Sequence, residues 1–393
     1  MMNVTSVKRI HQSDWTDSGV RFLRARDIVA AAKNEEPDDY LYISKEKYEE
    51  YSALSGKVGV SDLLVTGVGT IGVPYLVRNL EPLYFKDGNI IWFQNSDKID
   101  GKFLFYSFSA EQIQGFINES AGIGTVGTYT IESGKKTPIS LPNQIEQAKV
   151  GEFFQQLDNL ITLHQRKYDK LQVLKKAMLE KMFPKNGSSV PEIRFKGFTD
   201  AWEQRKLGEV VERITRKNEN LESTLPLTIS AQYGLINQNE FFDKRIASKD
   251  VSGYFLVRNG EFAYNKSTSS DAPWGAIKRL DRYESGVLST LYIVFKILDE
   301  SKTSSDYIVT YYNTDLWHKG IQAIAAEGAR NHGLLNVAPA DFFETNLTMP
   351  KDYAEQQQIG SFFQQLDHLI TLHQRELEKL QNIKKSMLEK MFV

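Results

Sequence analysis

The chain has 393 residues, of which 41% are hydrophobic and 25% charged, a balance typical of globular domains that excludes wholesale disorder. It has no cysteine, which excludes disulfides, thiolate zinc sites and cysteine nucleophiles. No apolar run of about 18 residues and no secretory signal occur, so we expect a cytoplasmic protein without a membrane partner. The formal charge of −2 does not favour binding nucleic acid through phosphate attraction alone.

The first segment, residues 1–142, predicts a globular domain of mixed β structure with short helices. It is rich in Gly, Tyr, Phe, Ser and Thr, with short β-branched runs between turn signals. We predict strands at 62–66, 73–77 and 89–93 and one helix at 103–117. Candidate ligand-binding side chains fall near the start of the segment and in a polar, glycine-bearing loop at 121–136: Arg24, Arg26, Thr125, Thr128, Tyr129, Lys135 and Lys136.

Two glycine patterns in this segment, at 67–72 and 122–127, match G-x-G-x-x-G. A dinucleotide-binding fold needs a helix to begin there, so that its N-terminal amides face the pyrophosphate. The residues after both patterns are instead typical of strands. We therefore predict tight turns where the backbone approaches a neighbour closely, with Thr66 and Thr70 as candidate contacts at the first of them.

The middle of the chain predicts a long helix, a linker and a second domain. Residues 143–183 are helical by pattern, residues 184–191 form a Pro, Gly and Ser linker, and residues 192–350 repeat the β-rich texture. The second domain has the same predicted order as the first, with strands at 261–264, 274–277 and 291–297 and a helix at 307–326. Its candidate binding residues lie in two loops: Asn265, Lys266, Ser267 and Ser270 in one, and Arg330, Asn331 and His332 in the other.

The last segment, residues 351–393, repeats the first helix. Residues 147–183 and 356–392 align without a gap at a constant offset of 209, and 26 of the 37 positions are identical. Apolar steps of three and four predict two rods that pack against each other along a heptad seam. We predict that the following residues form that helix–helix and subunit interface: Phe154, Leu157, Ile161, His164, Leu171, Met178, Phe363, Leu366, Ile370, His373, Leu380 and Met387.

No pattern of catalytic residues emerges. The chain lacks a Walker A loop and the Asn/Asp-Pro-Pro-aromatic site of amino methyltransferases, and its six histidines do not have metal-ligand spacing. We therefore predict no catalytic residue, no metal site and no enzyme activity of its own. The loops instead offer Arg, Asn, Thr and Ser, which suit guanine, adenine and phosphate contacts, although each alone is equally compatible with a solvated loop.

The helices containing FFQQLD-x-LITLHQR, the segment PEIRFKGFTDAWEQRKLGEV at 191–210 and the order head, helix, head, helix closely resemble the specificity subunit of type I restriction-modification systems. The resemblance implies an α+β fold: two target-recognition domains separated by two long antiparallel coiled-coil helices, with an internal pseudo-two-fold. It implies that each head reads half of a bipartite double-stranded DNA target. It also implies that the helices dock two modification (methyltransferase) subunits, which restriction motor-nuclease subunits join. No cofactor is then expected on this chain, while S-adenosylmethionine, ATP and Mg are expected on the partners.

One feature departs from the family pattern. A WEQRKLGE-like segment precedes the second head at 202–209, whereas only some 19 residues precede VRFLRARDI at the first. The first head is therefore expected to be shortened, which leaves a truncated, inactive specificity subunit as an alternative. A coiled-coil scaffold whose heads bind proteins is another, and a stand-alone nuclease or methyltransferase is disfavoured by the missing motifs.

Overall fold

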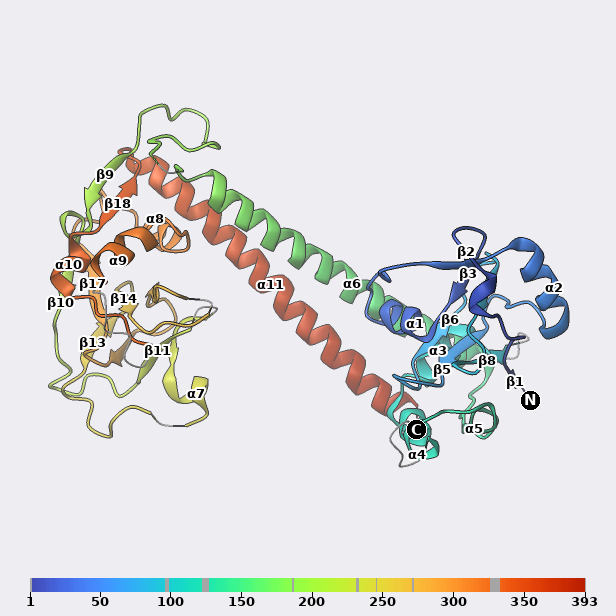
Figure 1. The fold of residues 1–393 in the computed structure, drawn as a ribbon. Helices are drawn as coiled ribbons and strands as arrows, with labels where there is room; N and C mark the ends of the chain where they lie inside the picture. The colour runs from blue at the N-terminus through green and yellow to red at the C-terminus, as the bar shows by residue number, and fades with distance from the viewer. Residues whose placement is uncertain are drawn as a thin grey trace. The chain divides into compact units, whose positions relative to one another are not determined.

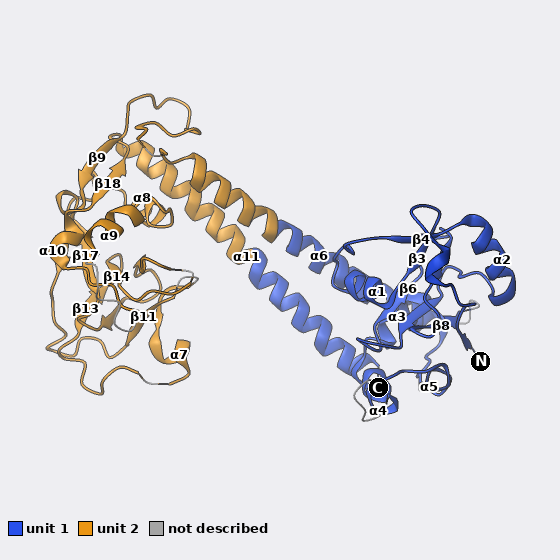
Figure 2. Ribbon diagram, viewed as in Figure 1, with its two compact units in different colours: residues 1–167, 373–393 blue, residues 168–372 orange. Residues whose placement is uncertain are grey.

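The computed structural model describes residues 2–95, 99–121, 127–185, 187–230, 233–244, 246–270, 272–325 and 333–392. The chain forms two compact units, residues 1–167 with 373–393 and residues 168–372. Each unit holds one head and part of both long helices, α6 (Gln144–Lys181) and α11 (Tyr353–Met391), as Figure 2 shows. The two long helices predicted from the repeat are confirmed, and the α+β class is confirmed with them.

The head of the first unit is built on two four-stranded sheets, with strand orders β1-β8-β5-β6 and β2-β4-β3-β7 (Figure 1). Its elements, in chain order, are β1 (Asn3–Thr5), η1 (Gln12–Asp14), β2 (Trp15–Thr16), β3 (Val20–Leu23), α1 (Ala25–Ala32), β4 (Leu41–Ile43), α2 (Lys45–Ser55), β5 (Leu63–Thr66), β6 (Pro74–Leu76), β7 (Leu83–Phe85), β8 (Ile90–Gln94), α3 (Gly101–Ser107), α4 (Glu111–Ser120) and α5 (Ile131–Lys135).

The head of the second unit has a four-stranded sheet of order β10-β17-β14-β15 and three two-stranded sheets, β11-β12, β13-β16 and β18-β9. Its elements are β9 (Glu203–Lys206), η2 (Leu207–Glu209), β10 (Val211–Ile214), β11 (Leu227–Ser230), β12 (Gly234–Asn237), α7 (Gln238–Phe242), β13 (Phe255–Arg258), β14 (Phe262–Asn265), β15 (Ala276–Arg279), β16 (Ser285–Leu288), β17 (Ile293–Ile297), α8 (Ser305–Tyr311), α9 (His318–Ile324), α10 (Pro339–Phe343) and β18 (Asn346–Met349).

The two heads share a frame. The sheets β1-β8-β5-β6 and β10-β17-β14-β15 are both fully antiparallel, and Leu63 pairs with Phe93 in the first as Phe262 pairs with Phe295 in the second. Two short helices then follow in each head, α3 and α4 or α8 and α9. Around the frame the heads differ, because the 11-residue helix α2 of the first head has only the five-residue α7 in the corresponding stretch of the second.

Each long helix is tied to its head by the same glutamine. In the first unit the Gln147 side chain accepts a hydrogen bond from the Asp100 amide at 3.0 Å and donates one to the Pro142 carbonyl at 2.8 Å. In the second unit Gln356 accepts from the Ser304 amide at 2.9 Å and donates to the Pro350 carbonyl at 2.9 Å. Because these glutamines are buried and both polar atoms of each amide have a partner, they fix the start of each long helix against the N-terminus of α3 or α8.

The prediction of a single helix at 103–117 and another at 307–326 is wrong, because each head forms two short helices there. In the second head the break falls at a run of Asn, Thr and Asp, where the Thr314 hydroxyl donates to the Tyr311 carbonyl and accepts from the Leu316 amide. Such local side-chain bonds compete with the helical ladder. In the first head the break lets Phe103 and Leu104 of α3 and Ile113 of α4 all enter one core.

Candidate nucleic-acid interface and helix repeat

Two loops meet at one edge of the first head, the β5–β6 loop and the segment that leads to α5. The Tyr129 amide donates to the Gly67 carbonyl at 2.9 Å, and the Gly67 amide donates to the Asn89 carbonyl at 2.8 Å. A Cβ at residue 67 would lie 2.6 Å from the Tyr129 carbonyl oxygen, so only glycine allows this approach. The contact joins two of the loops that the sequence predicted separately.

The glycine pattern at 67–72 leads into strand β6, which fits the predicted turn and not a nucleotide-binding helix. Residues 122–126 of the second pattern lie outside the described residues. The strand expected directly after this pattern is wrong, because the short helix α5 begins at Ile131 with Thr130 as its N-cap. The Thr130 hydroxyl accepts from the Ser133 amide at 3.1 Å, and this cap favours helix over strand at that point.

The predicted contact residues of these loops differ in exposure. Thr66 is fully buried. Its hydroxyl donates to the Thr70 carbonyl at 2.6 Å and accepts from the Val73 amide at 2.9 Å, so the prediction that Thr66 is a surface contact is wrong. Thr70 lies exposed beside it and Thr128 is half-buried. Tyr129 is buried, which raises its pKa to about 12, and its hydroxyl bonds Thr137. Lys135, paired with Glu132 at 2.8 Å, and Lys136 are exposed, whereas Thr125 lies outside the described residues.

The two predicted arginines of the first head have different surroundings. Arg24 is mostly buried at the start of α1, and its guanidinium pairs with Asp27 at 2.8 Å and Asp39 at 2.9 Å. Burial works against its charge, but the bonds to the two carboxylates outweigh burial and raise its pKa. Arg26 is exposed and pairs with Asp39 at 2.5 Å. Arg24 is thus committed to holding the α1 start, and Arg26 is the better placed of the two to reach a ligand.

The second head joins its two predicted loops in the same way. The Thr268 amide donates to the Gly333 carbonyl at 2.7 Å, and the Leu335 amide donates to the Lys266 carbonyl at 2.9 Å. A β-bridge between Ser267 and Leu334 completes the contact. The β14–β15 loop therefore lies against the segment that follows residues 326–332, as the β5–β6 loop lies against the segment before α5.

In these loops of the second head, Ser267 and Ser270 are exposed, while Asn265 and Lys266 are half-buried. The Asn265 side chain accepts from the Ser267 amide at 3.0 Å and shapes the turn. Partial burial lowers the pKa of Lys266, whose ammonium donates to the Val337 carbonyl at 3.4 Å. The predicted contacts Arg330, Asn331 and His332 lie outside the described residues.

The two long helices pack antiparallel in each unit, and the contacts of one unit recur in the other with the helices exchanged. In the first unit Phe154 of α6 packs on Phe392, and Asp158 pairs with Lys384 of α11 at 2.6 Å. In the second unit the residues 209 positions away do the same: Phe363 of α11 packs on Phe183, and Asp367 pairs with Lys175 of α6. The repeat therefore carries a self-complementary set of contacts, as in an isologous interface.

The remaining predicted seam residues also face inward. Leu157, Leu366 and Ile370 are buried, and Ile161, Leu171, Met178, Leu380 and Met387 are partly buried. His164 and His373, also 209 positions apart, lie in the first unit with their Nδ1 atoms 3.1 Å apart. Burial, followed by the charges of His164 and Lys167, lowers the pKa of His373, which favours the neutral form of its imidazole.

Not all apolar residues of the long helices are covered. Leu160 and Leu163 of α6 and their counterparts Leu369 and Leu372 of α11 have between 41% and 46% of their surface exposed. Both positions carry leucine in both copies of the repeat, although none of the four side chains is buried. We call them the leucine faces of the repeat.

Sequence reasoning missed the anchoring residues Gln147 and Gln356 and the glycines one turn later, Gly151 and Gly360. A Cβ on Gly151 would lie 2.8 Å from the Phe103 amide, and one on Gly360 would lie 2.8 Å from the Tyr307 amide. The available signal was that these four residues are identical in the two copies yet lie off the heptad seam.

Within the described part of the chain, no group of three or more acidic or histidine side chains could hold a metal ion. A search of the same residues finds no helix long and apolar enough to cross a membrane.

Comparison with known proteins finds similarity over part of the chain. Residues 23–173 match the type I restriction modification DNA specificity domain. A putative type I restriction enzyme specificity subunit of Haemophilus influenzae is 30% identical over 125 residues, 31% of each chain. The type I restriction enzyme MjaVIII specificity subunit of Methanocaldococcus jannaschii is 26% identical over 192 residues, which cover 46% of this chain and 42% of the relative. The matches thus span about a third and two-fifths of these relatives' lengths.

A solved structure covers more of the chain. The S subunit of a type I restriction-modification system from M. genitalium has a TM-score of 0.59 at 13% identity, and the match covers 100% of this chain and 94% of that one. At that identity the likeness concerns the fold. Residues 23–173 are thus similar to the type I restriction modification DNA specificity domain, and the chain shares its fold with that S subunit.

Proposed function

We propose that this chain is the non-catalytic DNA-recognition subunit of a type I restriction-modification complex, in which each head reads one half of a bipartite target. One observation carries the proposal: two heads with a common frame and different surrounding elements are attached to two nearly identical helices. Two nearly identical helices suit two identical partners, whereas two different heads suit two different half-sites.

The converging loops are the proposed reading surfaces. In each head, the loop between the third and fourth strands of the frame is bonded to the segment after the second short helix. Exposed Thr70, Lys136 and Ser267 lie in or beside these loops, and such side chains hydrogen-bond phosphates and base edges. Arg26 lies on the same head as Thr70 and adds a cation that reaches solvent.

The leucine faces support docking of two modification subunits. Packing within this chain does not require identical residues at exposed positions, yet Leu160, Leu163 and their counterparts are the same in both copies. An apolar surface that occurs twice suits two copies of one partner. Restriction motor-nuclease subunits would join that core.

The charge of the chain agrees with this division of work. At a net charge of −2, the isolated chain is expected to bind DNA weakly, because phosphate neutralisation would come mainly from the modification subunits. S-adenosylmethionine, ATP and Mg would likewise bind on the partner subunits, and this chain would bind none of them.

The proposal is tested by adding one negative charge to each reading surface. The reconstituted complex with modification subunits is incubated with a pool of random DNA, and the retained DNA is sequenced. Thr70→Glu should change base preference in one half of the target and Ser267→Glu in the other, because each carboxylate repels the phosphates under its own head. Gln381→Glu, an exposed site on α11, is the control for charge and should leave both halves unchanged. If both loop variants altered the same half, or neither altered any, the assignment of one half-site to each head would be wrong.

A further inference from the structure

The second head contains a cavity of about 460 Å³ beside its converging loops. Four parts of the head surround it: β11, α7 with the residues after it, the end of β14 with the loop that follows, and the turn between β16 and β17. Asn265 and Ser267 line one side, together with Leu334, which forms the β-bridge to Ser267. The cavity therefore borders the surface that is proposed to read DNA.

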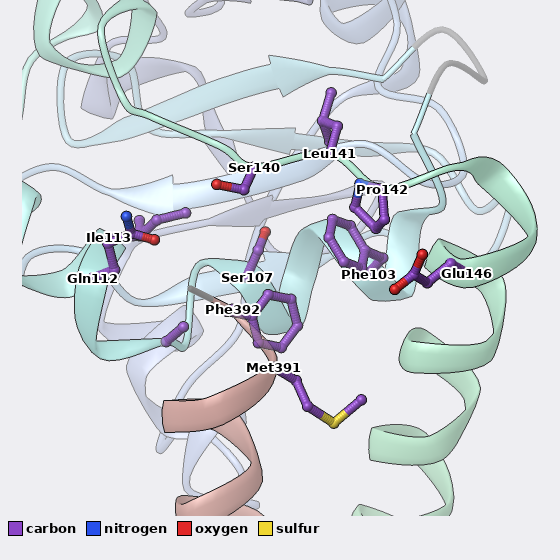
Figure 3. Close-up of a pocket in the computed structure, with 11 residues that line it drawn as sticks. Phe103, Ser107, Gln112, Ile113, Ser140, Leu141, Pro142, Glu146, Met391 and Phe392 are labelled. Carbon is purple, nitrogen blue, oxygen red and sulfur yellow. The ribbon is translucent and has the colours of Figure 1, made fainter.

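A cavity in the first unit has a different position (Figure 3). It measures about 250 Å³ and lies at the ends of the long helices, where Glu146, Met391 and Phe392 line it. None of the described residues that line it comes from the converging loops of the first head. This cavity therefore belongs to the junction between the head and the long helices rather than to a reading surface.

The walls of the cavity in the second head are mainly apolar, and the described residues that line it include no charged side chain. Phe242, Tyr254 and Tyr292 contribute aromatic rings. Three of the lining side chains reach the surface, since Phe242, Ile246 and Leu291 are 42%, 50% and 56% exposed. Exposed apolar side chains around a hollow are typical of a binding site, and the missing charge favours a neutral, flat group as its occupant.

Two amide side chains give the cavity its polar groups. The Asn265 side-chain oxygen accepts from the Ser267 amide, which leaves the N–H groups of Asn265 able to donate. The Oε1 atom of Gln238 is buried and has no hydrogen-bond partner among the described residues. A buried acceptor without a partner costs free energy that a ligand with an N–H donor at this place would recover. A donor and an acceptor together suit the edge of a nucleobase.

The cavity also lies where the two heads differ. Gln238 and Phe242 are the first and last residues of the five-residue helix α7, which takes the stretch that holds the 11-residue α2 in the first head. A site built from elements outside the common frame suits the recognition of one half-site rather than a function that both heads share.

We propose that this cavity takes up one nucleobase that rotates out of the DNA duplex, so that the second head reads one position of its half-site outside the base stack. The inference rests on the proposed function and adds to it the form in which one base is recognised. A nucleobase is flat and uncharged and has donors and acceptors on its edge, which match the Phe242 ring and the Gln238 and Asn265 amides. Stacking on an aromatic side chain offsets the free energy of unstacking the base.

The test uses the complex reconstituted with modification subunits and a duplex that contains the target recovered from the random pool. An abasic site is placed opposite each base of the second half-site in turn, and the affinity for each duplex is measured. An abasic site removes the pairing that extrusion must break, so the affinity should rise at the extruded position. This position should be distinct from the methylated base, since methyltransferases also extrude their own substrate base. If the affinity rises at no position besides the methylated base, the proposal is overturned.

Two neighbouring phenylalanines give a matched pair of variants. Phe242→Ala should abolish the rise at the extruded position and weaken binding of the intact target at least about fivefold, because the stacking contact is lost. Phe241 is 46% exposed and does not line the cavity, so Phe241→Ala should leave both measurements unchanged. Thermal unfolding checks that each variant is folded. Equal effects of the two variants on the affinity of the complex contradict a role of the cavity.

Gln238→Met tests the polar contact, because it removes the amide at nearly the same side-chain length and breaks no hydrogen bond of the unpartnered Oε1. Sequencing of the retained random DNA should show a changed base preference at the extruded position and at no other. Changes at several positions would contradict the recognition of a single extruded base.

The outcomes separate this inference from the proposed function. If Ser267→Glu alters no half-site, the proposed function fails and the inference fails with it. If Ser267→Glu alters one half-site but Phe242→Ala does not change the abasic-site scan, the inference alone is overturned. Equilibrium dialysis of the free chain with the four deoxynucleoside monophosphates distinguishes the source of the base. Binding of a monophosphate that Phe242→Ala abolishes and target DNA does not displace would identify a free nucleotide as the occupant and overturn the inference.

Discussion

Gln147 and Gln356 show how a single side chain sets the position of a helix. Each accepts a hydrogen bond from the backbone amide of the N-cap residue of a short helix. Each also donates one to the carbonyl of a proline just before the long helix. Since both are buried, truncating either would leave an amide and a carbonyl unsatisfied. The adjacent glycines allow the short helix to approach this closely.

Gly360→Ala is predicted to destabilise the chain by about 1–3 kcal/mol, because the new methyl group would meet the Asp306 and Tyr307 backbone at 2.8 Å. Gly115→Ala is the matched control, since a Cβ on that helical glycine meets nothing within 4 Å and should stabilise by about 0.8–1.0 kcal/mol. Denaturant unfolding of both variants measures the difference. Equal effects would mean that the close approach is not required.

The histidine pair predicts a pH dependence. Because the pKa of His373 is lowered from 6.5 in the folded chain, the unfolded chain binds more protons below that pH. The stability that depends on neutral His373 is complete above pH 6.5 and is lost as the pH falls through the pKa of His373 in the folded chain. The melting temperature should therefore fall between pH 8 and 5.5 by more in the native chain than in His373→Gln. His318, whose pKa burial also lowers, contributes equally to both proteins. An identical fall in both would rule out the pair as a source of the pH dependence.

At the scale of elements, the long helices have two functions on two faces. Leu157 is buried in the seam, whereas Leu160 is 43% exposed on a leucine face. Leu157→Ala should cost about 2–5 kcal/mol of stability through the cavity it leaves. Leu160→Ala should change stability by no more than about 0.5 kcal/mol but weaken association with the modification subunit.

The two leucine variants are compared by thermal unfolding of the free chain and by co-purification with the modification subunit. Loss of association in the folded Leu160→Ala variant, at unchanged stability, supports docking on the leucine face. If Leu160→Ala associates normally, the partner docks elsewhere on the chain.

The long helices could be predicted from the sequence because their periodicity and the offset of 209 are local, repeated patterns. Three of the four frame strands in each head were predicted within a few residues from local β-branched runs and turn signals, whereas β1 and β10 were not predicted. The pairing of Arg24 with Asp39 could not be predicted, because it joins residues 15 positions apart through a bend that no local pattern specifies. Thr66 was misassigned since a threonine before a glycine turn looks the same whether its hydroxyl faces solvent or closes the turn.

At the scale of the whole chain, the central feature is a repeated long helix that carries two different heads. The repeat accounts for identical seam contacts, identical anchors and identical leucine faces, while the heads differ around their common sheets. The sequence predicted this organisation but not that each head would bond its two polar loops together, because that contact depends on the sheet order. A chain of this kind would convert one pair of identical partners into a reader of two unlike half-sites.

The most direct test is methylome sequencing of a methylation-free host that expresses this chain with its cognate modification subunit. The account predicts one methylated motif with two dissimilar halves separated by a gap of fixed length, because two different heads are attached to one repeated pair of helices. Methylation confined to a single half-site, or two identical halves, would contradict the assignment of one half to each head. No methylation despite a stable complex with the modification subunit would show that the long helices dock their partner while a head does not read DNA.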